Sequence, residues 1–554
     1  MTRSGVVAGW TRGYRRDWLR GDALGALTAW ALIVPECVAY AQIAGVPPQN
    51  AFYAAPVALV AYVLLGRSRF LIVGATSAAS VLSAATVTAV SSDPKAAVGL
   101  SAALAVIVGA ILIAAGLARL GFITNFLAEP ALTGFLFGMA MTIIVRQVAK
   151  LVGVSSGDGN FFARLWHVLR QFTHWSWTTL AVGAVALAVL LALEHILPKL
   201  PAALVVLALG LLLSAALGLK DHGVAIVGRI PSAIPVPHLP GIPASDWAKL
   251  AGGAFGVALV VFAEAFSIAN RFAREHGDEV DASREMVSVG ASNLAVGFFR
   301  GFTVSGSASR SAAAEGAGSR SPMTSLIAAV LILITGAFLT PLFTDLPEPV
   351  LGAIVIVAVR GFLKVGEVRR YARLHRPSLW VALTALLGVL FFDLLPGLLL
   401  AVALSLVLFI ADASTPRLSV LGRLPGSTLY GDTAEHPDAT TTPGVLAVRP
   451  DGELFFGNTN RTRLALLDLL TAAGDASPRA VVLDLSASYR LGLPVLDALD
   501  DLREDLAHRN IPLHLARLRA RARQELDRHP LADHLGPTAI HPTVKAAVTL
   551  AGRR

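Results

Sequence analysis

An arginine and a glutamate lie inside apolar stretches of this chain, and both could act on an anion. Arg310 falls in GFTVSGSASRSAAAEG (301–316), and Glu264 falls in VALVVFAEAFSIANRFA (257–273). An ionised side chain at membrane depth is costly and normally faces a cavity or a partner. The planar guanidinium of Arg310 suits a carboxylate, sulfate or bicarbonate. Glu264 could carry a proton, because burial favours the neutral form of a carboxyl group.

Each of these two residues also has a structural interpretation. Arg310 could form a fixed bridge to Glu264 or to Glu315, in which case Glu264 would serve only as a counter-charge. We expect Arg310 to lie near the bound anion. For Glu264 both interpretations stay open, since a proton carried there would offset the charge of an entering anion.

Two segments rich in small and hydroxyl residues predict helices that begin inside the membrane. They are GATSAASVLSAATVTAV (74–90) and the segment that contains Arg310. Such a start presents unpaired N–H groups and about half a positive charge, which suits an anion. The predicted substrate-binding residues at the two starts are Thr76, Ser77 and Ala78, and Ser307, Ala308 and Ser309. Small residues could instead only permit close helix packing, but the matched positions in the two halves favour a site.

The first apolar segment, ALIVPECVAYAQIAG (31–45), contains further candidates. Pro35 is expected to interrupt the helix and to free backbone groups near the same depth. Tyr40 and Gln42 could then line the cavity as substrate-binding residues. We interpret Glu36 as a satisfied structural acid rather than a substrate ligand.

The composition indicates that these residues belong to a membrane protein. Of the 554 residues, 55% are hydrophobic and only 15% are charged, and the mean hydropathy is +0.65. Soluble proteins carry about 25% charged residues. Residues 97–118 contain no charge, and about 20 apolar residues are enough to cross the hydrocarbon. The net charge of +9 does not indicate nucleic-acid binding, because much of the Arg and Lys lies in short segments beside apolar runs.

We predict a polytopic α-helical membrane protein with about fourteen spans. The spans lie at 22–43, 51–66, 75–90, 97–118, 125–149, 178–196, 201–218, 249–272, 286–300, 307–316, 322–343, 348–363, 378–393 and 396–412. An Arg-rich N-terminal segment (1–21) and basic loops after the even-numbered spans place both ends in the cytoplasm. With one cysteine, Cys37, no internal disulfide is expected. No P-loop, HExxH, paired CxxC or GxSxG motif is present, which argues against an ATP-driven pump or an enzyme; no cofactor or metal is expected.

The composition changes after about residue 412. Residues 413–443 are rich in Pro, Thr, Gly, Ser and Asp, and we interpret them as a linker. Residues 444–554 predict a soluble α/β domain. In it, VLAVRP (445–450) and ELFFG (453–457) flank an Asp-Gly turn and predict a hairpin.

Several long stretches resemble the sulfate permease (SulP) family. They are GDALGALTAWALIVPECVAYAQIAGVPPQNAFYAAP (21–56), GRSRFLIVGATSAAS (66–80), EAFSIANRFA (264–273), GASNLAVGFFRGFTVSGSASRSAAAEGAGSRS (290–321) and LPEPVLGAIVIVAV (346–359). The tail resembles a STAS domain. The resemblance covers nearly the whole chain in the right order.

This resemblance implies a particular fold and assembly. It implies two inverted seven-span repeats, about 22–218 and 249–412, which form a core and a gate domain as in uracil permeases. A cytoplasmic STAS domain would follow. It also implies a homodimer in the plasma (inner) membrane, with the anion between the starts of spans three and ten. Ser309 and Arg310 match the Ser-Arg pair of the family, and Glu264 matches an acid implicated in proton coupling.

The resulting hypothesis is a secondary active transporter of a small anion, such as a dicarboxylate, sulfate or bicarbonate. We expect proton-coupled symport by an elevator-type movement; an uncoupled channel or an exchanger on the same fold is the alternative. A permease for neutral bases would not need Arg310, and a membrane sensor would show no flux. The chain departs from the family at Glu36, where Gln is usual. In the tail, Tyr489-Arg490-Leu491-Gly492 replaces Asp-Ser-Ser-Gly, which argues against a serine-phosphate switch.

Overall fold

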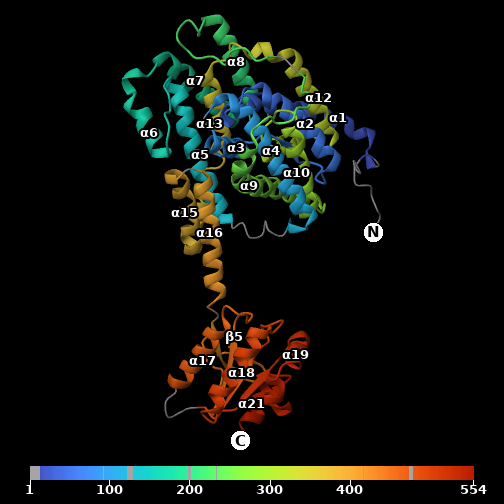
Figure 1. The fold of residues 1–554 in the computed structure, drawn as a ribbon, viewed down its shortest axis with the longest axis vertical. Coiled ribbons are helices and arrows are strands. Elements are labelled where there is room, and N and C mark those ends of the chain that lie inside the picture. Colours follow the sequence, from blue (N-terminus) through green and yellow to red (C-terminus); the bar gives the residue numbers. More distant parts are fainter. Residues whose placement is uncertain are drawn as a thin grey trace. The chain divides into compact units, whose positions relative to one another are not determined.

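The computed structural model describes residues 11, 13–91, 93–121, 129–197, 201–231, 234–392, 394–415, 417–472 and 478–553 (Figure 1). The first ten residues and Arg12, part of the predicted cytoplasmic segment, lie outside the described residues. The chain forms two compact units, Met1–Ser405 and Leu406–Arg554.

The first unit is a bundle of helices with one small sheet. Its helices are α1 (Leu19–Ala44), α2 (Gln49–Leu65), α3 (Ser77–Val90), α4 (Pro94–Leu117), α5 (Glu129–Val152), α6 (Phe161–Arg170), α7 (Trp177–Ile196), α8 (Ala202–Leu217), α9 (Ala244–His276), α10 (Ala282–Gly297), α11 (Ala308–Gly316), α12 (Met323–Ile334), α13 (Glu348–Arg360), α14 (Val365–Leu374) and α15 (Arg376–Phe392), followed by α16 (Leu394–Ala413), which runs into the second unit. A π-helical turn (Thr335–Leu339) and a 3-10 turn (Thr340–Phe343) continue α12. The sheet pairs β1 (Ile72–Gly74) with β2 (Ser305–Ser307).

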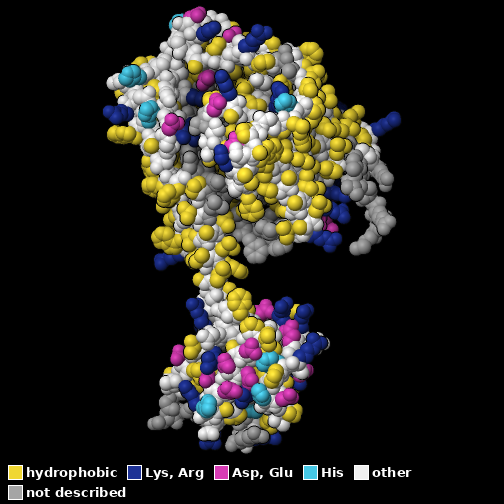
Figure 2. Space-filling view, viewed as in Figure 1, with side chains coloured by type: hydrophobic (Ala, Val, Ile, Leu, Met, Phe, Trp, Pro, Cys, Tyr) yellow, Lys and Arg dark blue, Asp and Glu magenta, His cyan; other side chains and the backbone are white. Residues whose placement is uncertain are grey.

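Helices occupy every predicted span, with ends that differ by a few residues. Eight described helical segments are long and apolar enough to cross a membrane, and four more are apolar but shorter. Figure 2 shows hydrophobic side chains over much of the visible face of this unit. The polytopic membrane fold is therefore confirmed, while the number fourteen stays a prediction. Two helices were not predicted: α6 and the amphipathic, Arg-rich α14.

The helices of the first unit sort into two bundles by their packing. Helices α1–α4 pack mainly against α9–α12. Helices α5 and α7 pack mainly against α13 and α15, while α6 packs against α5, and α8 packs against α7 and α1. Contacts between the bundles come chiefly from α1 with α8 and α13, and from α3 with α5. The first bundle contains both short helices that follow a strand, α3 and α11. It therefore positions the predicted site.

A buried carboxylate of α1 joins this helix to the residues that precede α12 in the first bundle. Asp22, in the first turn of α1, is fully buried and accepts hydrogen bonds from the backbone N–H groups of Arg320 (2.7 Å) and Ser321 (3.1 Å). The Ser321 hydroxyl donates to it as well, at 2.6 Å. An acid with this many donors stabilises the orphan N–H groups that precede a helix.

The second unit contains a six-stranded mixed sheet in the order β4-β3-β5-β6-β7-β8. Its strands are β3 (Leu418–Arg423), β4 (Tyr430–Asp432), β5 (Val445–Pro450), β6 (Ala480–Asp484), β7 (Leu513–Ala516) and β8 (Ile540–His541), and its helices are α17 (Thr459–Ala472), α18 (Leu493–Ala507), α19 (Ala520–Leu526), α20 (Leu531–Leu535) and α21 (Val544–Ala551). Strands β5 to β8 pair in parallel. Helices α17 to α20 contribute to the hydrophobic core on one face and α21 to that on the other.

Two predictions for the tail were wrong. The interpretation of 413–443 as a linker fails, because β3 and β4 lie there and pair with each other and β3 with β5. Residues 453–457 form no strand, so the predicted hairpin does not exist. The strand VLAVRP (β5) instead pairs on one side with β3, which precedes it in the chain, and on the other side with β6, which follows it.

Candidate anion site

The two short strands bring the two predicted half-helices together. β1 and β2 run antiparallel, with Ile72 opposite Ser307 and Gly74 opposite Ser305. α3 begins three residues after β1, and α11 begins directly after β2. Paired strands satisfy backbone groups that a broken helix would otherwise leave without partners in the bilayer. The sheet therefore allows both helices to begin inside the unit.

Hydroxyl caps begin both helices. The Thr76 Oγ1 accepts a hydrogen bond from the Ala79 N–H at 3.3 Å, and the Ser307 Oγ accepts one from the Arg310 N–H at 3.4 Å. A Thr or Ser at this position satisfies one of the free N–H groups of the first turn. The starts thus lie where the sequence predicts them; their role in substrate binding stays a prediction.

Arg310 is almost fully buried and reaches across to the other half of the chain. Its side chain is 1% exposed, and its Nη2 donates to the carbonyl oxygen of Ala75 at 2.7 Å. The guanidinium passes directly over Gly74, where an added Cβ would lie 2.7 Å from Nη1. A glycine is needed at that position so that the cation can approach the start of α3.

The acid that faces Arg310 is Glu36. Its Oε2 lies 3.4 Å from the Arg310 Nε, and its side chain is 13% exposed. The structural interpretation of Arg310 named Glu264 or Glu315 as its partner, and the ion pair with Glu36 replaces that pairing. The interpretation of Glu36 as a structural acid stays a prediction. Pro35 does not interrupt α1, which continues to Ala44. Glu36 therefore faces Arg310 from within an unbroken helix.

Glu264 lies in the same cluster and is held by the start of α3. The Thr76 hydroxyl donates to its Oε2 at 3.1 Å. The side chain is partly buried, one turn before the end of the apolar part of α9. One cation and two carboxyl groups thus surround the starts of α3 and α11.

The remaining predicted residues divide into two groups. Tyr40 is buried and hydrogen-bonds the Ser77 side chain, so it lies against the start of α3. Gln42 is engaged elsewhere, because its Oε1 accepts from the Lys150 Nζ of α5 at 2.8 Å. That bond joins the first bundle to the second, and Lys150 also pairs with Glu348 at 3.5 Å. Gln42 and Lys150 line a separate pocket of about 520 Å³.

Access to the two helix starts differs. Ser77 and Ala78 are buried at 3% and 0% exposure, whereas Ala308 and Ser309 are exposed. The Ser309 Oγ lies 3.2 Å from the Ser307 Oγ. The cluster is therefore open on the side of α11 and closed on the side of α3.

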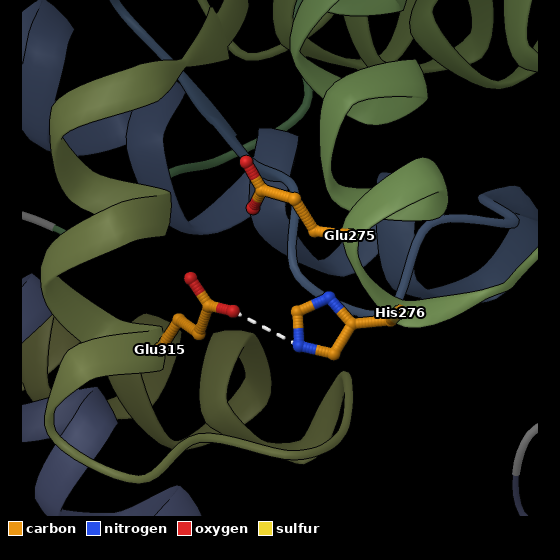
Figure 3. A group of neighbouring side chains, drawn as sticks. All are labelled: Glu275, His276 and Glu315. Carbon is orange, nitrogen blue, oxygen red and sulfur yellow. Dashed lines mark ion pairs between the residues drawn. The ribbon is translucent and has the colours of Figure 1, made fainter.

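The far ends of α9 and α11 are joined by a second group of ionisable side chains (Figure 3). The His276 Nε2 lies 3.0 Å from the Glu315 Oε1, and the His276 Nδ1 lies 3.0 Å from the Phe272 carbonyl oxygen. With Glu275 they offer metal-ligating atoms within 4.8 Å of one another. Both ring nitrogens of His276 thus lie within hydrogen-bond distance of an oxygen atom. Glu315 thus holds His276 and not Arg310.

Sequence reasoning missed two features of this site. Gly74 gave no signal by itself, since a glycine before a predicted helix start is common. Ser311, whose Oγ accepts from the Ile72 N–H at 2.9 Å, looked like an ordinary small residue. Both act through the partner strand, and strand pairing across the two halves could not be predicted from local sequence.

The comparison with protein families finds two matches. Residues 19–385 match the model described as the sulfate permease family, and residues 436–547 match that of the STAS domain. A probable sulfate transporter of Mycobacterium tuberculosis is 36% identical over 99% of both chains. Sulfate transporter 3.2 of Arabidopsis thaliana is 29% identical, over 97% of this chain and 87% of that protein.

Two solved structures have similar folds. The murine solute carrier 26 member A9 anion transporter, in an inward-facing state, gives a TM-score of 0.91 at 22% identity, over 99% of this chain and 94% of that chain. The transmembrane domain of a cyanobacterial bicarbonate transporter gives 0.62 at 19% identity, over 70% of this chain and 98% of that domain. At these identities the likeness shows the fold alone.

Proposed function

Since the chain belongs to the sulfate permease family, we propose that it carries a small oxyanion bound between the starts of α3 and α11. The observation that carries this proposal is Arg310, a buried cation beside two helix N-termini that meet across a strand pair. N–H groups, helix dipoles and a guanidinium fork together select an anion and do not require a metal. Sulfate, bicarbonate and a dicarboxylate such as fumarate all fit this chemistry.

The two carboxyl groups support proton coupling. With Glu36 and Glu264 both ionised, the cluster of Arg310, Glu36 and Glu264 carries a net negative charge, which repels an entering anion. The anion can take the place of Glu36 at the guanidinium only if that charge is reduced. Proton uptake on Glu36 or Glu264 reduces it, so that an anion and a proton enter together.

The packing of the helices supports an elevator-type movement. The bundle that contains the site packs within itself and contacts the second bundle through few helices. A bundle built in this way can shift as one body while the anion stays beside Arg310. We further propose that the protein is a homodimer in the plasma (inner) membrane. We place its N-terminus and STAS domain in the cytoplasm, because the loops after even-numbered spans are basic.

Flux into proteoliposomes tests the function and the coupling. We expect saturable uptake of radiolabelled sulfate, bicarbonate or fumarate, and faster uptake under an inward proton gradient. Glu264→Gln and Glu36→Gln remove one ionisable carboxyl each. We expect at least one of them to transport without a response to the gradient. Flux of the wild-type chain that follows voltage alone would indicate a channel, and flux that requires an anion on the other side would indicate an exchanger.

A further inference from the structure

A basic pocket lies at one end of the first bundle, away from Arg310. It has a volume of about 760 Å³ and is formed where the end of α2, the end of α4 and the start of α10 meet. Three of its lining residues are arginines: Arg67 after α2, Arg119 after α4 and Arg284 in α10. Gly116 of α4 lies so close to α10 that an added Cβ would meet the Ser283 carbonyl oxygen at 2.6 Å. The floor of the pocket is thus a tight helix–helix contact.

Acidic side chains offset only part of the positive charge of the pocket. Within the part of the chain that the structure describes, no ion pair joins these three arginine side chains to Asp or Glu. Asp281 also lines the pocket, but its Oδ1 accepts from the Arg284 N–H at 2.8 Å and so caps α10. The neighbouring Glu285 is fully buried and accepts from the Tyr62 hydroxyl at 2.5 Å. Three cationic forks are therefore available to an external anion.

The position of the arginines along the spans places them at headgroup depth. Arg67 follows the last residue of α2, and Arg119 follows the last residue of α4, each by two positions. Arg284 is the third residue of α10. Because α2 and α4 are apolar along their length, their ends mark the border of the hydrocarbon. On its visible face, Figure 2 shows Lys and Arg side chains at the lower edge of the apolar surface of this unit.

The same pocket has an apolar side that faces outward. Leu117, the last residue of α4, is 73% exposed, and Leu65 and Val287 line the pocket beside it. A free phosphate or nucleotide would gain nothing from exposed leucine at its edge. A lipid would place its phosphate among the arginines and its acyl chains against Leu117.

We propose that this pocket binds the headgroup of an anionic phospholipid. Arg67 after α2, Arg119 after α4 and Arg284 in α10 hold the phosphate, and all three belong to the bundle that also contains Arg310. The lipid then joins the ends of α2, α4 and α10, which stabilises this bundle as a unit. Basic pockets between spans are a recurrent form of lipid recognition.

Thermal unfolding of the purified full-length chain in a neutral detergent tests the proposal. We expect short-chain phosphatidylglycerol to raise the midpoint saturably, and phosphatidylcholine of the same chain length to leave it unchanged. The triple substitution Arg67→Gln, Arg119→Gln, Arg284→Gln should weaken the lipid affinity by roughly a hundredfold. Native mass spectrometry should show one phosphatidylglycerol retained per wild-type chain and none per triple variant.

A matched control removes three exposed arginines of α14, at Arg369, Arg370 and Arg373, by the same substitution. It should keep the response to phosphatidylglycerol. An equal loss of the response in this control would mean general charge attraction and would contradict binding at the pocket. An equal rise of the midpoint with inorganic phosphate or glycerol phosphate would mean a site for soluble anions and would contradict lipid binding. If the triple variant does not fold, Arg119→Gln alone, in an exposed position, should weaken the affinity several-fold. No transported anion is present in these measurements, so their outcome does not depend on the proposed transport function.

Discussion

The starts of α3 and α11 have the same backbone plan but different side chains. Each follows a three-residue strand, each has a hydroxyl N-cap, and the two strands pair with each other. At α3 the capping hydroxyl of Thr76 also donates to Glu264, and the next two residues are buried. At α11 the first two residues, Ala308 and Ser309, are exposed, and the buried Arg310 follows them. The repeated backbone thus brings the two helix starts together, and the difference between the side chains decides which helix presents the charge.

Removal of the Arg310 guanidinium, which only α11 provides, should have the largest effect on anion uptake. Arg310→Ala deletes the charged donor, and we expect anion uptake into proteoliposomes to fall by at least about thirtyfold. Arg310→Lys keeps the positive charge but lacks the planar guanidinium, so its uptake should lie between that of the wild type and that of Arg310→Ala. Arg310→Ala also leaves Glu36 without its partner, so Glu36→Gln in the same chain should recover thermal stability but not uptake. Wild-type uptake by Arg310→Ala would remove Arg310 from the site.

Substitution of the two strand glycines, Gly74 and Gly306, should distinguish an effect on uptake from an effect on stability. At Gly74 an added Cβ meets the mobile end of the Arg310 side chain, whereas at Gly306 it meets Leu71 at 2.7 Å and the Ala265 Cα at 3.0 Å. Gly74→Ala should therefore displace the guanidinium and lower uptake about tenfold with a nearly unchanged unfolding midpoint. Gly306→Ala should lower stability by about 1–3 kcal/mol through overpacking. The reverse pattern, with Gly74→Ala the less stable variant, would contradict the observed approach of Arg310.

The two caps should differ in their effect on pH dependence. Thr76→Val and Ser307→Ala each remove an N-cap hydroxyl, and each should cost about 1 kcal/mol of stability. Only Thr76→Val also removes the donor to Glu264. We expect uptake as a function of pH to change for Thr76→Val and to stay in place for Ser307→Ala. Equal profiles would mean that Glu264 does not titrate during transport.

The smallest effect is expected at Ser309. Ser309 is exposed at the open side of α11, and within the described part of the chain the only side-chain partner of its hydroxyl is the Ser307 hydroxyl. Ser309→Ala should weaken the apparent affinity by no more than a few-fold, with unchanged stability, as measured by uptake at varied anion concentration. Ala78→Ser at the buried start of α3 is the matched change. It should leave the affinity unchanged and lower stability, because it buries a hydroxyl.

Local sequence predicted the helix starts but not the partners of their side chains. Runs of Gly, Ala, Ser and Thr around 74–90 and 301–316 located both half-helices, because backbone preferences act over a few residues. The pairing of Arg310 with Glu36 depends on how α1 lies against α11, and no local pattern contains that information. Glu264 and Glu315 were as plausible as Glu36 on sequence distance and charge alone.

Composition misled in the segment after the membrane unit. Pro, Thr, Gly and Asp in 413–443 are typical of a linker, yet Leu418–Arg423 forms a strand because its alternate residues, such as Leu421, enter the hydrophobic core of the tail. The Asp-Gly turn at 451–452 follows β5 as a hairpin turn would. The chain then continues into α17, because β5 already has a neighbour on each side.

The pairing of β1 with β2 has a consequence for how the protein is made. Ala75 and Arg310 are 235 residues apart in the chain, so the ribosome completes the first half long before the second strand exists. Until then, the backbone of β1 has no partner strand and Glu36 has no cation. The binding centre therefore assembles late in membrane insertion, and a chain released early from translation lacks the start of α11 and its cation.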